Sequence, residues 1–226
     1  MEHVLDNPAY NALATGNQNL SNGNTQIKYF NKEVAPFVGL KNTSTENFNA
    51  LYDILPHDGP FVFVPAKVTD IPSPWQTLAA IPGYQMVYKG EILPVDNANL
   101  TNLTDEHIPQ MLELTQLTNP GPFAERTIDF GHYVGIFDGD KLAAMAGQRM
   151  NPVPYAEISA VCTHPDYTGK GYARQLLAFH INRIKREGNI PFLHVRADNE
   201  RAIKVYHSLG FEMRSEVYFY VIKKQL

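Results

Sequence analysis

The segment over residues 163–174, THPDYTGKGYAR, combines the residue types that bind an anion at a helix start. An apolar run typical of a strand precedes it, and an amphipathic pattern typical of a helix follows. Backbone amides at a helix N-terminus point outward, the helix dipole adds positive charge, and glycine lets a phosphate approach closely. The spacing therefore predicts a phosphate-binding turn, formed by Thr168, Gly169, Lys170, Gly171, Tyr172 and Ala173.

Two better-known phosphate motifs do not fit this turn. A Walker A loop would need Gly at His164 and Ser or Thr at Gly171, and the dinucleotide fingerprint would need a third glycine at Arg174. A Gly-x-Gly turn alone is equally typical of a purely structural connection, so its function depends on what accompanies it.

A second motif places Asn199, Ala202, Tyr206, Gly210 and Phe211 at the spacing of a capped helix that ends at glycine. Together with the apolar run over 156–163 and the turn, it resembles the GNAT superfamily of N-acetyltransferases over roughly residues 94–226. The resemblance implies an α/β fold with a mixed, mostly antiparallel sheet flanked by helices. It also implies acetyl-coenzyme A as co-substrate and no metal.

The chain departs from the family pattern at Thr168, where Arg or Gln usually opens the phosphate loop. The main contribution of this position would be its backbone amide. We therefore expect weakened rather than abolished coenzyme binding if the position matters.

The resemblance assigns roles within the second motif. It implies that Tyr206 is the general acid that protonates the departing thiolate, although Ala202, Val205 and Leu209 share its apolar stripe and a core tyrosine would look the same. Asn199 is expected to cap the helix, to contact the ligand, or to do both. The preceding strand end is expected to pair with the pantetheine amides and to offer one amide to the thioester oxygen, through Val161, Cys162 and Thr163.

An amine acceptor must lose a proton before it attacks, because its pKa resembles the ~10.4 of lysine. Glu157 lies eleven residues before the opening position of the loop, where histone-type members of the superfamily carry their catalytic glutamate, so the resemblance makes it the candidate base. His132 and His164 are alternatives. Cys162 suggests an acyl-cysteine intermediate, but a small buried strand residue is the stronger interpretation because no histidine partner is apparent.

Three further residues are candidates for contact with an acidic or carboxylate-bearing acceptor: Arg126, Tyr133 and Arg149. Surface ion pairs would explain the two arginines equally well. The first 93 residues, with DNP at 6–8 and VAPF at 34–37, resemble more faintly the leading lobe of relatives of glycine N-acyltransferase, in which a degenerate GNAT-like lobe packs on the active one. We therefore expect an N-terminal lobe over residues 1–93 and a catalytic domain over residues 94–226.

Local patterns predict the elements that must position these residues. Capping residues and helical spacing predict helices over residues 8–13, 104–115, 174–187 and 200–209, and another that follows Ser44 and ends at Pro56. Apolar or alternating runs predict strands over residues 61–64, 85–88, 133–137, 141–149, 155–163, 192–195 and 217–222. The asparagine-rich residues 15–25 are expected to form a loop, and five prolines between 65 and 94 to break any long element.

Composition sets outer limits on the function. The chain has 226 residues, 44% of them hydrophobic, and a formal net charge of −4, which provides a core and disfavours generic nucleic-acid binding. Cys162 is the only cysteine, which excludes an internal disulfide and a multi-cysteine metal site. The start is not typical of a signal peptide, and no apolar run approaches the ~20 residues of a membrane span, so we expect a cytoplasmic protein with no membrane or nucleic-acid partner.

The sequence thus predicts an N-acetyltransferase that moves an acetyl group from acetyl-coenzyme A to a primary amine of a small molecule or peptide by direct attack. Two alternatives stay open. One is a transferase of longer acyl chains to amino acids, and the other is a catalytically silent protein that binds coenzyme A as a regulator. Thr168 mildly favours the silent protein, while Glu157 and Tyr206 count against it.

Overall fold

The computed structural model describes residues 3–65 and 67–225, and within them eleven strands form one sheet in the order β1-β2-β3-β4-β11-β5-β10-β9-β8-β7-β6. The strands are β1 (Asn22–Gly23), β2 (Ile27–Tyr29), β3 (Phe37–Leu40), β4 (Phe61–Phe63), β5 (Trp75–Tyr88), β6 (Thr101–Asn102), β7 (Val134–Asp138), β8 (Lys141–Gln148), β9 (Tyr155–Thr163), β10 (Ile190–Arg196) and β11 (Phe211–Lys224). Only β3–β4 and β9–β10 pair in parallel within this part of the chain.

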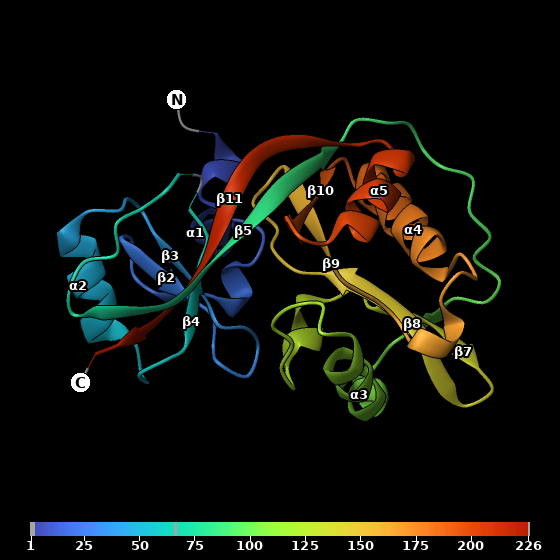
Figure 1. Cartoon of the computed structure of the whole chain (residues 1–226), viewed down its shortest axis with the longest axis horizontal. Coiled ribbons are helices and arrows are strands. Elements are labelled where there is room, and N and C mark those ends of the chain that lie inside the picture. The colour runs from blue at the N-terminus through green and yellow to red at the C-terminus, as the bar shows by residue number, and fades with distance from the viewer. Residues whose placement is uncertain (1–2, 66, 226) are drawn as a thin grey trace.

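Helices cover the sheet in two groups (Figure 1). The α-helices are α1 (Pro8–Ala14), α2 (Thr45–Ile54), α3 (Ile108–Thr118), α4 (Tyr172–Arg186) and α5 (Glu200–Leu209). Short 3-10 turns are Val4–Asp6, Gln18–Leu20, Asp105–His107, Thr127–Phe130 and Pro165–Tyr167. Helices α1 and α2 lie with β2 to β4, and α3, α4 and α5 lie around β7 to β10. The predicted class, a mixed and mostly antiparallel sheet flanked by helices, is confirmed.

The long strands β5 and β11 join the two groups (Figure 1). They pair from Phe211 opposite Tyr88 to Lys224 opposite Trp75, while β11 also pairs with β4 and β5 also pairs with β10. A single buried cluster contains residues of both groups, from Leu5 to Val217. The two groups therefore share a sheet and a core, and a division at residue 93 stays a prediction.

The proline-rich stretch forms a longer strand than the sequence predicts. The expected strand covered only residues 85–88, whereas β5 runs through Pro82. The Pro82 carbonyl accepts a hydrogen bond from the Ala197 amide, so both the carbonyl and the nitrogen of Pro82 face the β10 side of the strand and not β11. The pairing of β5 with β10 ends one residue away, at Gly83 opposite Arg196. A missing N–H costs no ladder bond to β11 there, which is why the proline is tolerated.

Most other elements form where local signals predict them. The Ser44 side chain accepts a hydrogen bond from the Asn47 amide at the start of α2, and Gly210 ends α5 in the left-handed conformation. The asparagine-rich residues 15–25 are not all loop, because they contain the 3-10 turn Gln18–Leu20 and strand β1, which pairs with β2. Strands β2 and β3 were also not predicted, although every residue of β3 is buried. Strand β11 also exceeds the expected 217–222 at both ends, since its partner β5 is equally long.

None of the helices in the described residues is both long and apolar enough to cross a bilayer.

Candidate active site

The predicted phosphate-binding turn forms the start of α4. Gly169 and Gly171 have φ angles of +84° and +82°, and a Cβ added at either would meet nothing within 4 Å. Glycine is therefore required by backbone conformation and not by crowding. Within the described chain, the amides of residues 169–174 donate to no backbone carbonyl, and Gln175 makes the first helical bond, to Gly171. A row of free N–H groups thus faces open space at a helix start.

Two cationic side chains accompany this turn. Lys170 Nζ lies 4.7 Å from the centre of the Tyr167 ring, and Arg174 Nη1 donates to Ser208 Oγ at 3.1 Å. The hydroxyl and the backbone amide of Thr168 both donate to the Pro165 carbonyl, at 3.0 and 3.3 Å, so the expected contribution of the Thr168 amide is not available in this conformation and the free amides begin at Gly169. The turn therefore has the positive character that an anion needs.

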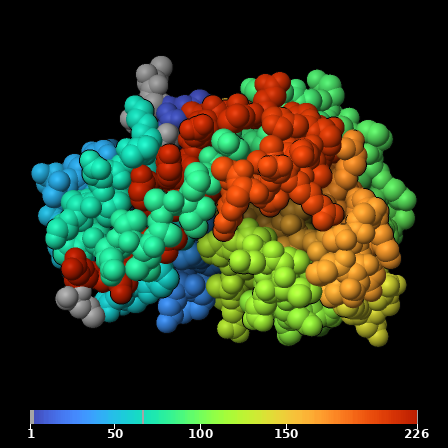
Figure 2. All heavy atoms as spheres, viewed as in Figure 1, coloured from blue at the N-terminus to red at the C-terminus, as the bar shows by residue number. Residues whose placement is uncertain are grey.

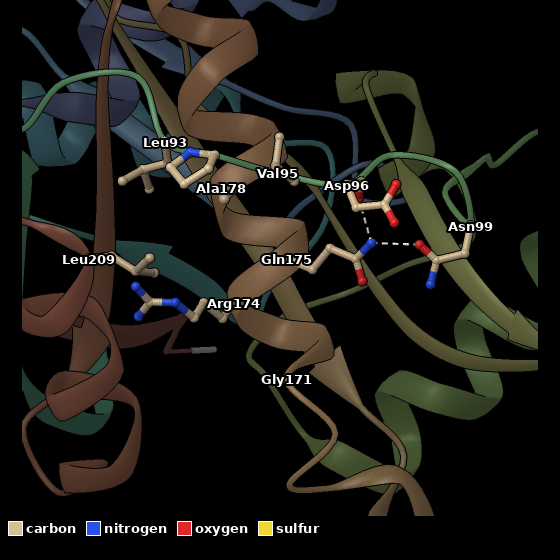
Figure 3. A pocket seen from close by; sticks show the side chains of 10 residues that line it. Leu93, Val95, Asp96, Asn99, Gly171, Arg174, Gln175, Ala178 and Leu209 are labelled. Atoms are coloured by element: carbon tan, nitrogen blue, oxygen red, sulfur yellow. Dashed lines mark hydrogen bonds between the residues drawn. The ribbon is translucent and has the colours of Figure 1, made fainter.

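A cavity of about 420 Å³ adjoins the turn between α4 and residues 93–99 (Figure 3). Gly171, Arg174 and Gln175 line it, and Gln175 Nε2 donates to the Asp96 carbonyl at 2.6 Å and to Asn99 Oδ1 at 2.5 Å. These bonds hold the crossing segment against the helix. Neither Tyr206 nor Glu157 lines this cavity, so the predicted catalytic groups lie elsewhere.

A larger cavity, of about 650 Å³, opens where β9 and β10 separate. The two strands pair only from Ile190 opposite Tyr155 to Phe192 opposite Glu157. Ala160 then adopts a φ of +50°, next to a register shift in the pairing of β8 with β9. Beyond this point residues 158–161 and 194–196 form opposite walls of the cavity. Figure 2 shows the hollow between the orange-red atoms of the α5 region and the yellow-green atoms of the α3 region.

Tyr206 of α5 and Asn199, at the N-cap of this helix, both line the cavity. Burial, with a smaller contribution from Cys162, raises the pKa of Tyr206 to about 12, so its hydroxyl keeps its proton at neutral pH. Its ring packs on Phe211 with centroids 6.0 Å apart. Asn199 Oδ1 accepts from the Ala202 amide at 3.1 Å and caps α5, so this residue both caps the helix and lines the cavity.

Glu157 is completely buried behind the cavity wall. Its carboxylate accepts from Arg149 Nε at 2.9 Å and Nη2 at 2.5 Å, and from His194 Nδ1 at 2.7 Å. Burial alone would raise the pKa of Glu157, but Arg149 and His194 together hold it well below its ordinary value. Its two partners do line the cavity: Arg149, whose side chain is 11% exposed, and His194.

His194 was not predicted from the sequence, and its role depends on Gln85. Gln85 Oε1 accepts from Arg214 at 2.8 Å, and Gln85 Nε2 donates to the Leu5 carbonyl at 2.9 Å. The same Nε2 lies 3.0 Å from His194 Nε2, which must then accept. His194 is thereby fixed with its proton on Nδ1, toward Glu157. In the apolar run FLHV a single histidine gives no local sign of this network.

Several candidates lie away from the cavity. Arg126 is on the surface, paired with Asp129 at 2.5 Å and Asp105 at 3.4 Å, and does not line the cavity. Tyr133 is buried against Phe123, its hydroxyl has no hydrogen-bond partner among the described residues, and burial raises its pKa. Of the three candidate acceptor contacts, the structure brings only Arg149 to the cavity wall.

The remaining candidates are also outside the cavity. Cys162 is 1% exposed, and burial raises the pKa of its thiol to about 12, so the thiol stays protonated in the core. His164 Nδ1 accepts from the Asp166 amide at 3.2 Å within the loop, and His132 lies in a connection at φ +59°. No cluster of three or more His, Cys, Asp or Glu suited to a metal ion occurs in the part of the chain described.

Comparison with known proteins adds independent findings. A profile of the FR47-like protein family matches residues 133–220. A solved structure assigned to the GNAT family of acetyltransferases, from Novosphingobium aromaticivorans DSM 12444, matches with a TM-score of 0.91 and 30% identity over 100% of both chains. The similarity therefore extends over the N-terminal strands as well as over the matched profile.

Two curated relatives match in sequence over shorter regions. N-alpha-acetyltransferase RimI of Mycobacterium tuberculosis is 35% identical over 85 residues, which is 36% of this chain and 52% of that protein. The ribosomal protein bS18-alanine N-acetyltransferase of Salmonella typhimurium is 28% identical over 116 residues, which is 48% of this chain and 77% of that protein. The match thus spans only about half the length of the mycobacterial relative.

Proposed function

This chain belongs to the GNAT family of acetyltransferases, and from that premise we propose that it transfers an acetyl group from acetyl-coenzyme A to a primary amine by direct attack in a ternary complex. The observation that carries the proposal is the row of free amides at residues 169–174, and Tyr206 in the second, larger cavity supports it. The names of the relatives, which give an N-alpha group and an alanine of ribosomal protein bS18, support an amine as acceptor.

The chain's own residues would hold the donor from two sides. The amides of residues 169–174 would bind the pyrophosphate, helped by the charges of Lys170 and Arg174. The pantetheine would enter where β9 and β10 separate, because residues 158–161 of β9 face the cavity there and not β10. The amide of Val161 is then a candidate donor to the thioester oxygen as its negative charge grows.

Tyr206 would supply the proton that the leaving thiolate needs. Tyr206 lines the larger cavity, and its hydroxyl is protonated at neutral pH, since burial raises its pKa to about 12. Burial would also raise the pKa of the coenzyme A thiol, which brings it closer to the pKa of Tyr206 and eases the proton transfer. Tyr206 therefore acts in this proposal as the general acid.

The contacts of Glu157 favour a positioning role. Both carboxylate oxygens are occupied by Arg149 and His194, and the side chain is not exposed to the cavity. A wall that presents Arg149 would lower the pKa of a bound amine, so the acceptor can bind in its neutral form. That Glu157 removes the proton stays a hypothesis. If it does, the pH dependence of the rate should change in Glu157→Gln.

The first experiment is thermal unfolding in the presence of acetyl-coenzyme A and of coenzyme A. A ligand at 100 times its dissociation constant should stabilise the fold by ~2.7 kcal/mol, which raises the unfolding midpoint visibly. An amine panel with detection of released thiol then tests turnover, and longer acyl donors in competition test chain-length preference. No midpoint shift with either coenzyme would refute the proposal, and a shift without thiol release would leave a coenzyme-binding protein without turnover.

A matched pair of variants separates ligand binding from folding. Gly171→Ala and Gly188→Ala both place a side chain at positive φ, +82° and +79°, in open space, at the two ends of α4. Both should lower stability by about 1–2 kcal/mol. Only Gly171→Ala should also weaken coenzyme binding, and equal effects of the two variants on coenzyme affinity would argue against the phosphate site.

A further inference from the structure

The larger cavity has an unequal distribution of charge. Two arginines, Arg149 and Arg196, and His194 line it, whereas the lining within the described residues includes no Asp or Glu. Arg196 is more than half exposed and is paired with Asp198 through two hydrogen bonds. The cation that matters inside the cavity is therefore Arg149, with its counter-charge, Glu157, completely buried behind it.

Arg149 is held in one orientation by contacts on two sides. Its Nε and Nη2 donate to Glu157, and its guanidinium carbon lies 4.7 Å from the centre of the Phe37 ring. The third nitrogen, Nη1, makes no hydrogen bond within the described residues. Glu157 fixes one edge of the guanidinium and Phe37 covers one face, so the N–H groups of Nη1 have a defined direction. Arg149 lines the cavity in this orientation.

The rest of the lining mixes polar with apolar residues, and its apolar side chains come from both halves of the chain. β3, β4, β5 and β11 contribute Phe37, Val62, Ile81, Phe219 and Val221, and the loop after α3 contributes Phe123. These side chains would bury an apolar group that lies next to the cation. A polyamine or a lysine-rich segment would instead bring extra positive charge to a wall that has no exposed carboxylate.

We propose that the acceptor is a primary amine that carries a carboxylate and an apolar body, with the carboxylate bound to Arg149 and the apolar body between the two halves of the chain. This rests on the proposed function, because it names the class of amine that the transferase acetylates. A carboxylate on Nη1 would form a charge-assisted hydrogen bond in a partly desolvated site, which is the kind that contributes most to recognition. The carboxylate can belong to a free amino acid or to an acidic residue of a peptide.

Matched ligands test this on the unaltered protein. We expect phenylalanine to bind about tenfold or more tightly than phenylalaninamide, measured by ligand-observed NMR with and without coenzyme A, and to show a similar preference in kcat/KM. Phenylalaninamide has the less basic amino group, so more of it is in the neutral form that would bind. This difference favours the amide and therefore works against the expected result. Two peptide amides, one that begins with Asp and one that begins with Asn, distinguish a free amino acid from a peptide as the source of the carboxylate. If the Asp peptide is preferred to the Asn peptide while phenylalanine and its amide bind equally, the carboxylate belongs to a side chain. Equal or tighter binding of the amide, together with equal binding of the Asp and Asn peptide amides, would overturn the proposal.

Variants of the Arg149–Glu157 ion pair test whether Arg149 causes the preference for the carboxylate. The double variant Arg149→Met/Glu157→Gln removes both charges together, and the ratio of phenylalanine to phenylalaninamide affinity should fall to about one. The control Arg186→Met makes the same change at an exposed arginine and should keep the ratio of the unaltered protein. A ratio that survives in the double variant would overturn the assignment to Arg149.

The two levels of the proposal fail differently. If no amine releases thiol and coenzyme A gives no thermal shift, the proposed function fails, while the NMR comparison still decides whether the cavity selects a carboxylate. If thiol release is equal for phenylalanine and its amide and also for the Asp and Asn peptides, the transferase stands and the carboxylate proposal falls.

Discussion

The pair of Arg149 and Glu157 allows a prediction about stability that follows directly from burial. Glu157 is unexposed and Arg149 is 11% exposed, with hydrogen bonds of 2.9 and 2.5 Å between them. Removing one partner leaves the other as an uncompensated buried charge, which costs about 3–5 kcal/mol. We therefore expect Arg149→Met and Glu157→Gln each to lower the free energy of unfolding by that amount.

The double variant should behave differently from the sum of the single variants. Replacing a buried ion pair by neutral side chains of similar volume is often close to neutral, so the double variant should cost less than either single change. The coupling energy should then be about 4 kcal/mol or more, similar to the ~4 kcal/mol attraction of two charges 4 Å apart at an effective dielectric constant of 20.

Urea unfolding at pH 7 measures this cycle, followed by the fluorescence of Trp75, which is 5% exposed and is the only tryptophan. The matched surface pair Lys204 and Glu200, 3.6 Å apart with both side chains at least 80% exposed, should show no measurable coupling. Additive effects of the two buried changes would refute the reasoning. Because the pKa of Glu157 is lower in the folded than in the unfolded chain, its contribution is present above about pH 4.5 and is lost as the pH falls toward the folded value.

Three further predictions concern single residues. Tyr206→Phe should lower the turnover number and leave the thermal shift by coenzyme A unchanged, and an unaltered rate would remove Tyr206 as the acid. His180 is fully buried, neither ring nitrogen has a well-formed hydrogen bond among the described residues, and burial lowers its pKa to about 3 from 6.5. The free energy of unfolding therefore falls as the pH falls below 6.5, and His180→Leu removes this loss. Urea unfolding measures the difference in free energy of unfolding between His180→Leu and the unaltered protein, and between pH 7.5 and pH 5 this difference should shift by about 2 kcal/mol in favour of the variant. Cys162, at 1% exposure, should react with iodoacetamide only after unfolding, as mass spectrometry can follow, and rapid alkylation of the folded protein would contradict its burial.

Elements with a local physical cause were the predictable part of the fold. The amphipathic pattern of α4, the cap at Ser44 and the stop at Gly210 each depend on residues within a few positions. The length of β5 was not predictable in this way. Its prolines indicate a break, and only the presence of β11 on one side and the end of β10 on the other makes Pro82 acceptable.

The buried network of the cavity wall depends on contacts that no local pattern encodes. Gln85 and His194 are 109 residues apart, and His194 and Glu157 are 37 apart, yet they form one chain of hydrogen bonds across neighbouring strands. Each residue alone resembles an isolated polar residue in an apolar strand. Register decides their role, because a shift of one residue turns every side chain to the opposite face.

This difference explains why the donor is easier to infer than the acceptor. The candidate donor contacts are backbone amides, and glycines at positive φ next to a helix start are sufficient to present them. The candidate acceptor contacts are side chains from both halves of the chain, and Arg149 differs from Arg126 only in its neighbours. Arg126 meets two exposed carboxylates at the surface, whereas Arg149 lies opposite Glu157, with its backbone N–H bonded to the Glu157 carbonyl at 3.0 Å, and against Phe37. The same residue type is therefore a surface charge in one place and a candidate selector of substrate in the other, and tertiary contacts alone distinguish them.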